Sequence, residues 1–192
     1  MAGQQVVHVG ATMRRLVAAA VLVVVAGCAS APAAPLPPVP SPAAETDGLF
    51  HLQLTLPRLD WQAGDAITGT ATLSFTGPVP TTVYGSGGGV IGFTYVEVGG
   101  TRSVEPVWTD DCGPHPLGPV APITVPLSKS GAVPDSEPDA EFLRSFLLTD
   151  PGVVRLPAGT WDVSAVTQFL DGDACSGASH SMKATARIRV AG

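Results

Sequence analysis

The amino-acid sequence predicts an all-β fold, an antiparallel β-sandwich of about seven strands with one short helix, and three observations lead to this fold class. Apolar and polar residues alternate along several segments after residue 49. Turn-forming residues are abundant, with 22 glycines and 19 prolines among 192 residues. Helical spacing of apolar residues is found in one short stretch, residues 138–148. Half-buried strands produce such alternation, so we expect two packed sheets, with a small barrel as the alternative.

The first two predicted strands show the alternation clearly. In FHLQLTLP, residues 50–57, every second residue from Phe50 to Leu56 is apolar, and the residues between them are polar. The segment AITGTATLSF, residues 66–75, sets Leu73 and Phe75 against threonine and serine in the same way. Each segment therefore has one face for a core and one face for water.

The middle of the chain contains a predicted hairpin. The segments VIGFTYVEV and RSVEPVW, residues 90–98 and 102–108, are joined by Gly-Gly-Thr at 99–101, which favours a tight turn. The alternation slips after Tyr95, which indicates a bulge or burial on both faces. Because Pro106 cannot donate to a ladder, the second strand is expected to lie at an edge or to end early.

One helix and a closing pair of strands complete the predicted elements. In PDAEFLRSFLL, residues 138–148, Asp139 is placed to cap a helix whose apolar side chains share one face. The segments WDVSAVTQF and MKATARIRV, residues 161–169 and 182–190, again alternate with period two. They predict the last two strands of the sandwich.

The amino-terminal segment has the layout of a secretory signal. Twelve residues, Leu16–Gly27, are all Leu, Val, Ala or Gly and follow Arg14 and Arg15, and they are too few for the roughly 20 residues that span a bilayer. The segment ends in VAGC, residues 25–28, which resembles the lipobox of bacterial lipoproteins. The resemblance implies cleavage before Cys28, fatty acyl chains such as palmitate on its thiol, and anchoring to the extracytoplasmic face of the cell membrane.

The sequence thus divides into a signal peptide (1–27), a lipidated cysteine with a linker rich in proline and alanine (28–48), and a β-sandwich domain (49–192). The linker holds six prolines. Such a stretch favours polyproline II and makes a semi-rigid spacer of up to roughly 60 Å at ~3.1 Å per residue. Met13 directly precedes the paired arginines, so translation starts at either Met1 or Met13.

Charge argues against one class of partner. All 16 acidic residues and 8 of the 10 basic residues follow Cys28, which gives this part of the chain a net charge of −8. A surface of this sign repels phosphate groups, so we expect no nucleic-acid partner.

Two family resemblances bear on the fold. The order of AGD (63–65), two strands, a hairpin and LPAGTWDVSAV (156–166) before a final strand resembles bacterial immunoglobulin-like domains. The stretch TLSFTGPVPTTVYGSGGGVIGFTYVEVGG (72–100) is similar to the intracellular proteinase inhibitor family, whose members are sandwiches of this kind. Both resemblances imply an immunoglobulin-like β-sandwich. No residue can be carried over from the second family as an inhibitory site.

Two cysteines remain once Cys28 carries lipid. Cys112 and Cys175 lie on the oxidising side of the membrane, where we expect them to form a disulfide. Their loops also contain histidines and aspartates, so zinc and calcium sites are the alternatives, although aspartate beside glycine is first of all turn chemistry. No metal or cofactor is assigned. We predict these loops as binding loops through Asp110, Asp111, His115, Asp171, Asp173 and His180.

A third candidate binding loop contains Gly85, Ser86 and Gly87. It invites comparison with the glycine-flanked serine of serine proteases, but glycine replaces the aspartate expected before the serine, and the histidine and aspartate partners are missing at recognisable distances. A flexible hairpin loop is the expected structure. Among the tryptophans, Trp161 is expected in the core, whereas a binding platform is the alternative role of all three, Trp61, Trp108 and Trp161.

These features predict a lipid-anchored binding or structural module and not an enzyme. Its expected partners are the membrane, through the lipid on Cys28, and another protein of the cell envelope. The alternative function is a peptidase inhibitor acting through an exposed loop near Gly87. A third hypothesis is a metal-binding protein or metal-assisted hydrolase that uses His115, His180 and the loop aspartates.

Overall fold

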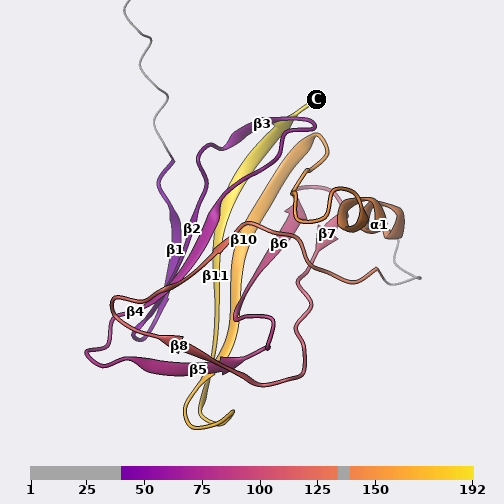
Figure 1. Ribbon diagram of the computed structural model, residues 1–192. Coiled ribbons are helices and arrows are strands. Elements are labelled where there is room, and N and C mark those ends of the chain that lie inside the picture. The colour runs from indigo at the N-terminus through magenta and orange to yellow at the C-terminus, as the bar shows by residue number, and fades with distance from the viewer. Residues whose placement is uncertain (1–39, 134–138) are drawn as a thin grey trace, which may run out of the picture. The chain divides into compact units, whose positions relative to one another are not determined.

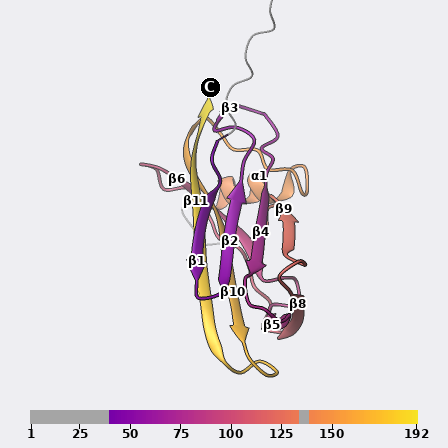
Figure 2. The ribbon, with the colours of Figure 1, turned by 90° about the vertical axis from the view of Figure 1, so that its left-hand side faces the viewer.

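The residues that the structure describes form an all-β sandwich with one helix, as the sequence predicted (Figure 1). It is a computed structural model, and it describes residues 40–133 and 139–192. One sheet has four strands in the order β1, β2, β4 and β9, with the bounds Ala43–Asp47, Phe50–Thr55, Thr70–Phe75 and Ile123–Pro126. Figure 2 shows this sheet face-on.

The second sheet has seven strands. Its main path runs β3 (Asp60–Gln62), β11 (Ala178–Ala191), β10 (Gly159–Asp171), β5 (Thr81–Gly85) and β8 (Gly113–Leu117). β6 (Ile91–Glu97) also pairs with β10, and β7 (Ser103–Val104) pairs with β6. All these pairs are antiparallel except β3 with β11. The described residues thus form eleven strands, and the ones beyond the expected seven are short.

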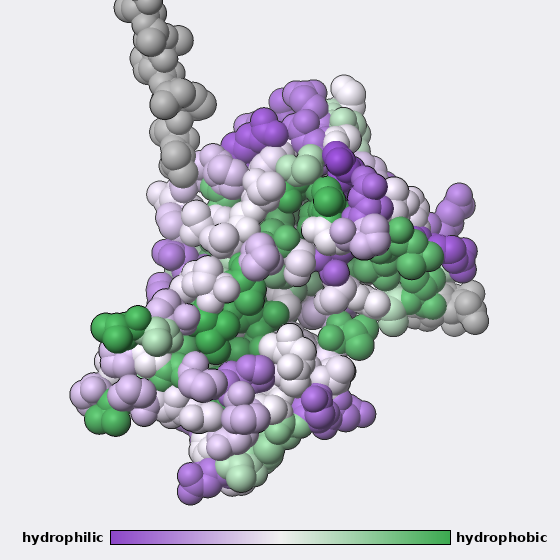
Figure 3. Space-filling view, viewed as in Figure 1, coloured by the Kyte–Doolittle hydropathy of each residue, from purple (hydrophilic) through white to green (hydrophobic). Residues whose placement is uncertain are grey.

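Alternation along the strands builds the core between the two sheets. In β2, Phe50, Leu52 and Leu54 are buried and the intervening polar residues are half-buried. In β10, Trp161 and Val163 are fully buried on the same inner row. Hydrophobic residues are visible through the centre of the face in Figure 3 and over the helix at its right. Removal of these side chains from water is the main force that holds the sheets together.

The predicted hairpin is confirmed, including the slip in its pattern. β6 is buried on both faces from Gly92 to Tyr95, which explains why period two fails there. Gly99 adopts a φ of +79° in the turn, a conformation that glycine reaches without a steric penalty. β7 ends at Val104, and the chain then leaves the sheet before Pro106, which has no N–H for a ladder.

β5 and β6 form one interrupted strand beside β10. Tyr84 pairs with Leu170, and Ile91 pairs with Thr167. The chain therefore advances seven residues from Tyr84 to Ile91 while β10 advances three, so extra residues lie between the two pairs. The extra residues form a bulge, residues 86–90, closed by a 2.8 Å hydrogen bond from the Gly89 N–H to the Ser86 carbonyl. The expected hairpin loop is therefore wrong here: the segment is a bulge, because both flanking strands pair with β10.

The helix α1 (Ala140–Leu148) confirms the helical spacing seen in the sequence. Leu143 and Phe146 are buried, and Lys129 donates to the carbonyl oxygens of Phe146 and Thr149 at its carboxyl end. Asp139 does not cap the amino end, since its carboxylate instead accepts a hydrogen bond from the Thr101 hydroxyl. Among the described residues no helix has the length and apolar character needed to cross a bilayer.

The linker prediction is wrong over its last residues. Residues 43–47 were assigned to the linker but form β1, which pairs along its whole length with β2. Its middle residues are exposed, so no apolar alternation marks it in the sequence. Polar contacts hold it instead: Glu45 accepts a hydrogen bond from the backbone of Lys183, and Asp47 lies 2.7 Å from His180. These contacts cover the outer edge of β11, which would otherwise expose unpaired backbone groups.

An ion pair within the β6–β7 hairpin packs against aromatic rings of the core. Arg102 donates to both carboxylate oxygens of Glu97, with Nε 2.7 Å from Oε2. The guanidinium also lies 5.2 Å from the ring centroid of Trp161 and 5.5 Å from that of Phe142 on α1. The hydrogen bonds from Arg102 hold the pKa of Glu97 below its ordinary value of 4.5.

The variant Glu97→Gln tests this ion pair. Because the folded pKa of Glu97 is depressed, its contribution is present above the ordinary glutamate pKa and is lost as the pH falls through the folded value. We expect the variant to be less stable at neutral pH and to show a shallower loss of stability on acidification. Urea unfolding followed by tryptophan fluorescence between about pH 7 and about pH 3 measures this. Glu141→Gln on the exposed face of α1 is the control, and parallel curves for wild type and Glu97→Gln would contradict the assignment.

Candidate functional site

Part of the predicted site lies outside the described residues. The signal peptide, Cys28 and the linker up to residue 39 belong to this part of the chain. Lipidation of Cys28 therefore stays a prediction, and the folded domain must be judged on its own.

The expected disulfide is present. Cys112 and Cys175 are bonded with an S–S distance of 2.00 Å and a Cα–Cα distance of 6.1 Å. The bond joins the segment after β7 to the turn between β10 and β11. The bond uses both thiols that a zinc site would need. Within residues 40–133 and 139–192, no three His, Cys, Asp or Glu side chains are arranged to hold a metal ion.

The segment between β7 and β8, residues 105–112, is called the strap here because it crosses the outer face of the second sheet. The carboxylate of Asp111 accepts hydrogen bonds from the Gly87 N–H, at 3.0 Å, and from the Thr109 hydroxyl. These hydrogen bonds hold the pKa of Asp111 below its ordinary value, and the hydrogen bond from Thr109 has the largest effect. The Ser86 hydroxyl lies 2.6 Å from that of Thr109 and accepts the Thr109 N–H at 3.1 Å. The strap is thereby fastened to the bulge.

His115 completes this cluster. Its Nε2 lies 2.9 Å from the backbone oxygen of Ser86, and β8 places the ring there by pairing with β5. The structure therefore brings together the predicted residues of two separate loops: Gly85, Ser86, Gly87, Asp110, Asp111 and His115. Ser86 is only 9% exposed. Its hydroxyl contacts Thr109, and the contact of the His115 ring is with its backbone, so the pair is not arranged for nucleophilic attack.

The remaining predicted residues lie apart from this cluster. His180 occupies the inner row of β11, stacked on Phe169, with Asp47 at 2.7 Å from Nδ1 and Asp171 at 3.2 Å from Nε2. The strap crosses the outer face of the same sheet. Asp173 is exposed in the β10–β11 turn. Sequence position suggested that the two histidines belong to similar loops, but His115 lies on β8 against the bulge, whereas His180 lies on β11 against Asp47 and Phe169.

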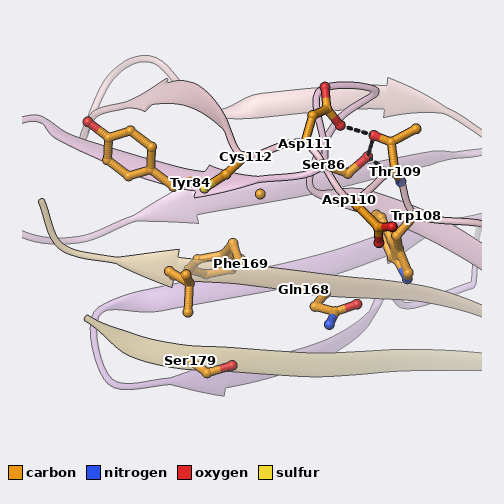
Figure 4. Close-up of a pocket in the computed structure, with 12 residues that line it drawn as sticks. Tyr84, Ser86, Trp108, Thr109, Asp110, Asp111, Cys112, Gln168, Phe169 and Ser179 are labelled. Carbon is orange, nitrogen blue, oxygen red and sulfur yellow. Dashed lines mark hydrogen bonds between the residues drawn. The ribbon is translucent and has the colours of Figure 1, made fainter. Parts of the chain in front are cut away.

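A pocket of about 270 Å³ lies between the strap and the sheet. In Figure 4 the strap residues Trp108 and Cys112 stand over the strands that carry Gln168, Phe169 and Ser179, and Tyr84 lies at the opposite end from Trp108. Trp108 was predicted only as part of a binding platform, and Tyr84, Gln168 and Ser179 were not predicted to line a site. These three lie within strands, and which strand residues face a pocket depends on where the strap crosses.

A glycine sets the position of Trp108. A Cβ at Gly92 would lie 2.8 Å from Cβ of Pro106, closer than real Cβ contacts, and 3.0 Å from Cη2 of Trp108, which is tighter than most of them. The strap therefore packs directly on the backbone of β6. The other two tryptophans are buried in the core, Trp161 as predicted and Trp61 at 3% exposure. Trp108 alone among the three is partly open to a ligand.

Comparison of the chain with models of known protein families and with curated protein sequences finds no match. The function therefore has to be argued from the chemistry of the site itself.

Removing the disulfide tests its contribution to the fold. The double variant Cys112→Ala/Cys175→Ala frees a loop with a sequence separation of 63 residues. The chain-entropy relation predicts a loss of about 4 kcal/mol in the free energy of unfolding. Urea unfolding of the oxidised wild type and the double variant measures the difference. Equal unfolding midpoints would show that the bond does not constrain the unfolded chain.

The variant Gly92→Ala tests the packing of Trp108 against β6. The added methyl group must displace Pro106 and Trp108, and overpacking of this kind costs about 1–3 kcal/mol. We expect lower stability together with a change in tryptophan fluorescence, because Trp108 gains exposure. Gly88→Ala is the matched control, since its Cβ would meet only the Ser86 hydroxyl at 3.6 Å. If the two variants behave alike, the strap does not pack tightly on β6.

Proposed function

We propose that this chain is a lipid-anchored protein on the extracytoplasmic face of the cell membrane and that its sandwich domain binds an envelope protein without catalysing a reaction. The lipid would be attached to Cys28, and residues 29–42 would form the spacer. The site around the strap would face the partner.

The disulfide is the single observation that carries this proposal. Such bonds persist on the oxidising side of a membrane and are rare in the cytosol. The bond between Cys112 and Cys175 therefore supports export of the domain. Export in turn agrees with the apolar segment 16–27 and with the VAGC sequence that ends it. Two independent parts of the chain thus indicate the same compartment.

The chemistry of the pocket supports binding. Its lining combines an indole, a phenol, two carboxylates, an amide and hydroxyl groups, from Trp108, Tyr84, Asp110, Asp111, Gln168, Ser86 and Ser179. A few convergent polar groups beside aromatic rings are typical of ligand sites. Catalysis by Ser86 would need a general base on its hydroxyl, and the neighbour of that hydroxyl is Thr109.

Labelling of the anchor tests the proposal. Cells that produce the full chain are grown with a radioactive fatty acid, and we expect label on the wild-type protein, which sediments with membranes. Cys28→Ala should lose the label and leave the membrane fraction, because its thiol carries the lipid. The double variant Cys112→Ala/Cys175→Ala is the control and should keep the label. A wild-type protein without label, or one that retains residues 16–27, would contradict the anchor.

A further inference from the structure

Two pockets meet at Trp108 on the outer face of β10 and β11. The first, described above, lies between strap residues 108–112 and β5. The second also measures about 270 Å³ and lies beside Glu105 and Pro106, over Val166 and Ser181. Trp108, Gln168 and Ser179 line both pockets. The two pockets therefore adjoin at these three residues, and together we call them the strap groove.

The charged side chains that line the strap groove are all acidic. Its lining includes the carboxylates of Glu105, Asp110 and Asp111, and no lysine, arginine or histidine is among the lining residues. Asp111 is already engaged by Gly87 and Thr109. The carboxylates of Glu105 and Asp110 form no hydrogen bond or ion pair with any residue that the structure describes, and both residues are exposed. They remain free to bind a positive charge.

Trp108 stands between these two carboxylates along the strap. Its indole is half-buried and held against Gly92, so its position is fixed before a ligand arrives. The face of an indole ring attracts an ammonium or guanidinium group, and a neighbouring carboxylate adds a charge-assisted hydrogen bond. The groove thus offers a cation two kinds of attraction at one point.

The floor of the groove suits an extended chain. Gln168 and Ser181 are exposed and face each other in the pairing of β10 with β11, and Ser179 follows on the same outer row. Their amide and hydroxyl groups can both donate and accept hydrogen bonds. The carbonyl and N–H groups of a peptide backbone need both kinds of partner. A small cation would fill one pocket, whereas a peptide would use the floor of both.

We propose that the strap groove binds an extended peptide segment of an extracytoplasmic protein, with an arginine or lysine side chain over Trp108 and between Glu105 and Asp110. The location of the partner rests on the proposed function. The binding chemistry does not, because it needs only the folded domain. A cationic group could come from a peptide side chain or from a free amine or guanidine. The experiment distinguishes these two sources.

A titration followed by NMR tests the proposal. The processed chain, purified in mild detergent and labelled with ¹⁵N, is titrated with the peptide acetyl-AARAA-amide. We expect the indole N–H signal of Trp108 to shift, and this signal is identified by its loss in Trp108→Leu. The same peptide with neutral citrulline in place of arginine should bind about tenfold more weakly, since it lacks the charge-assisted contacts. Butylguanidinium should also bind about tenfold more weakly, because it leaves the floor of the groove empty.

Two matched variants locate the binding. Asp110→Asn should weaken binding of the arginine peptide about tenfold, whereas Asp173→Asn, which removes the same charge from the nearby turn, should leave it unchanged. Equal binding of the arginine and citrulline peptides, or no shift at Trp108, would overturn the cation site. Equal binding of butylguanidinium and the peptide would overturn the peptide assignment. Unlipidated Cys28→Ala should bind the peptide as the wild type does, so a failure of anchoring is distinguishable from a failure of the groove.

Discussion

The antiparallel pairing of β10 with β11 is the constraint on which the rest of the structure depends. It runs without interruption from Gly159 with Val190 to Asp171 with Ala178. Because side chains alternate across a strand, this one ladder serves two purposes. Its inner row supplies much of the core, and its outer row is the floor of the strap groove. The edge of β11 receives β1, and the turn at the end of the ladder carries Cys175, to which the strap is bonded.

The strap is held at three points that differ in chemistry. Gly92 lets it pack on the sheet, Asp111 bonds it to the bulge, and Cys112 ties its end to the β10–β11 turn. A loop held in this way loses little conformational entropy when a ligand binds, so more of the binding energy becomes affinity. The groove beneath it is open at the surface and acidic. Under the proposed function, this groove would hold the envelope partner.

The strands that the sequence predicted well are those with one buried face. β2, β4, β10 and β11 all follow period two, because each packs one row against the other sheet. β1 was missed since backbone pairing and two carboxylates hold it without a buried row. β8 and β9 were missed for a related reason: GPHPL and ITVP contain prolines, which are typical of turns, and the strands tolerate them at the edges of their sheets.

The sequence by itself determined the fold class, the helix and the pairing of Cys112 with Cys175, because hydrophobic periodicity and the chemistry of thiols are local properties of a chain. Only the tertiary structure decided the site. It placed His115 against the bulge and His180 against Asp47 of β1, and it turned an apparent hairpin loop into a bulge. It also left Trp108 half-buried while Trp61 and Trp161 are buried, since the crossing point of the strap depends on contacts between residues far apart in the chain.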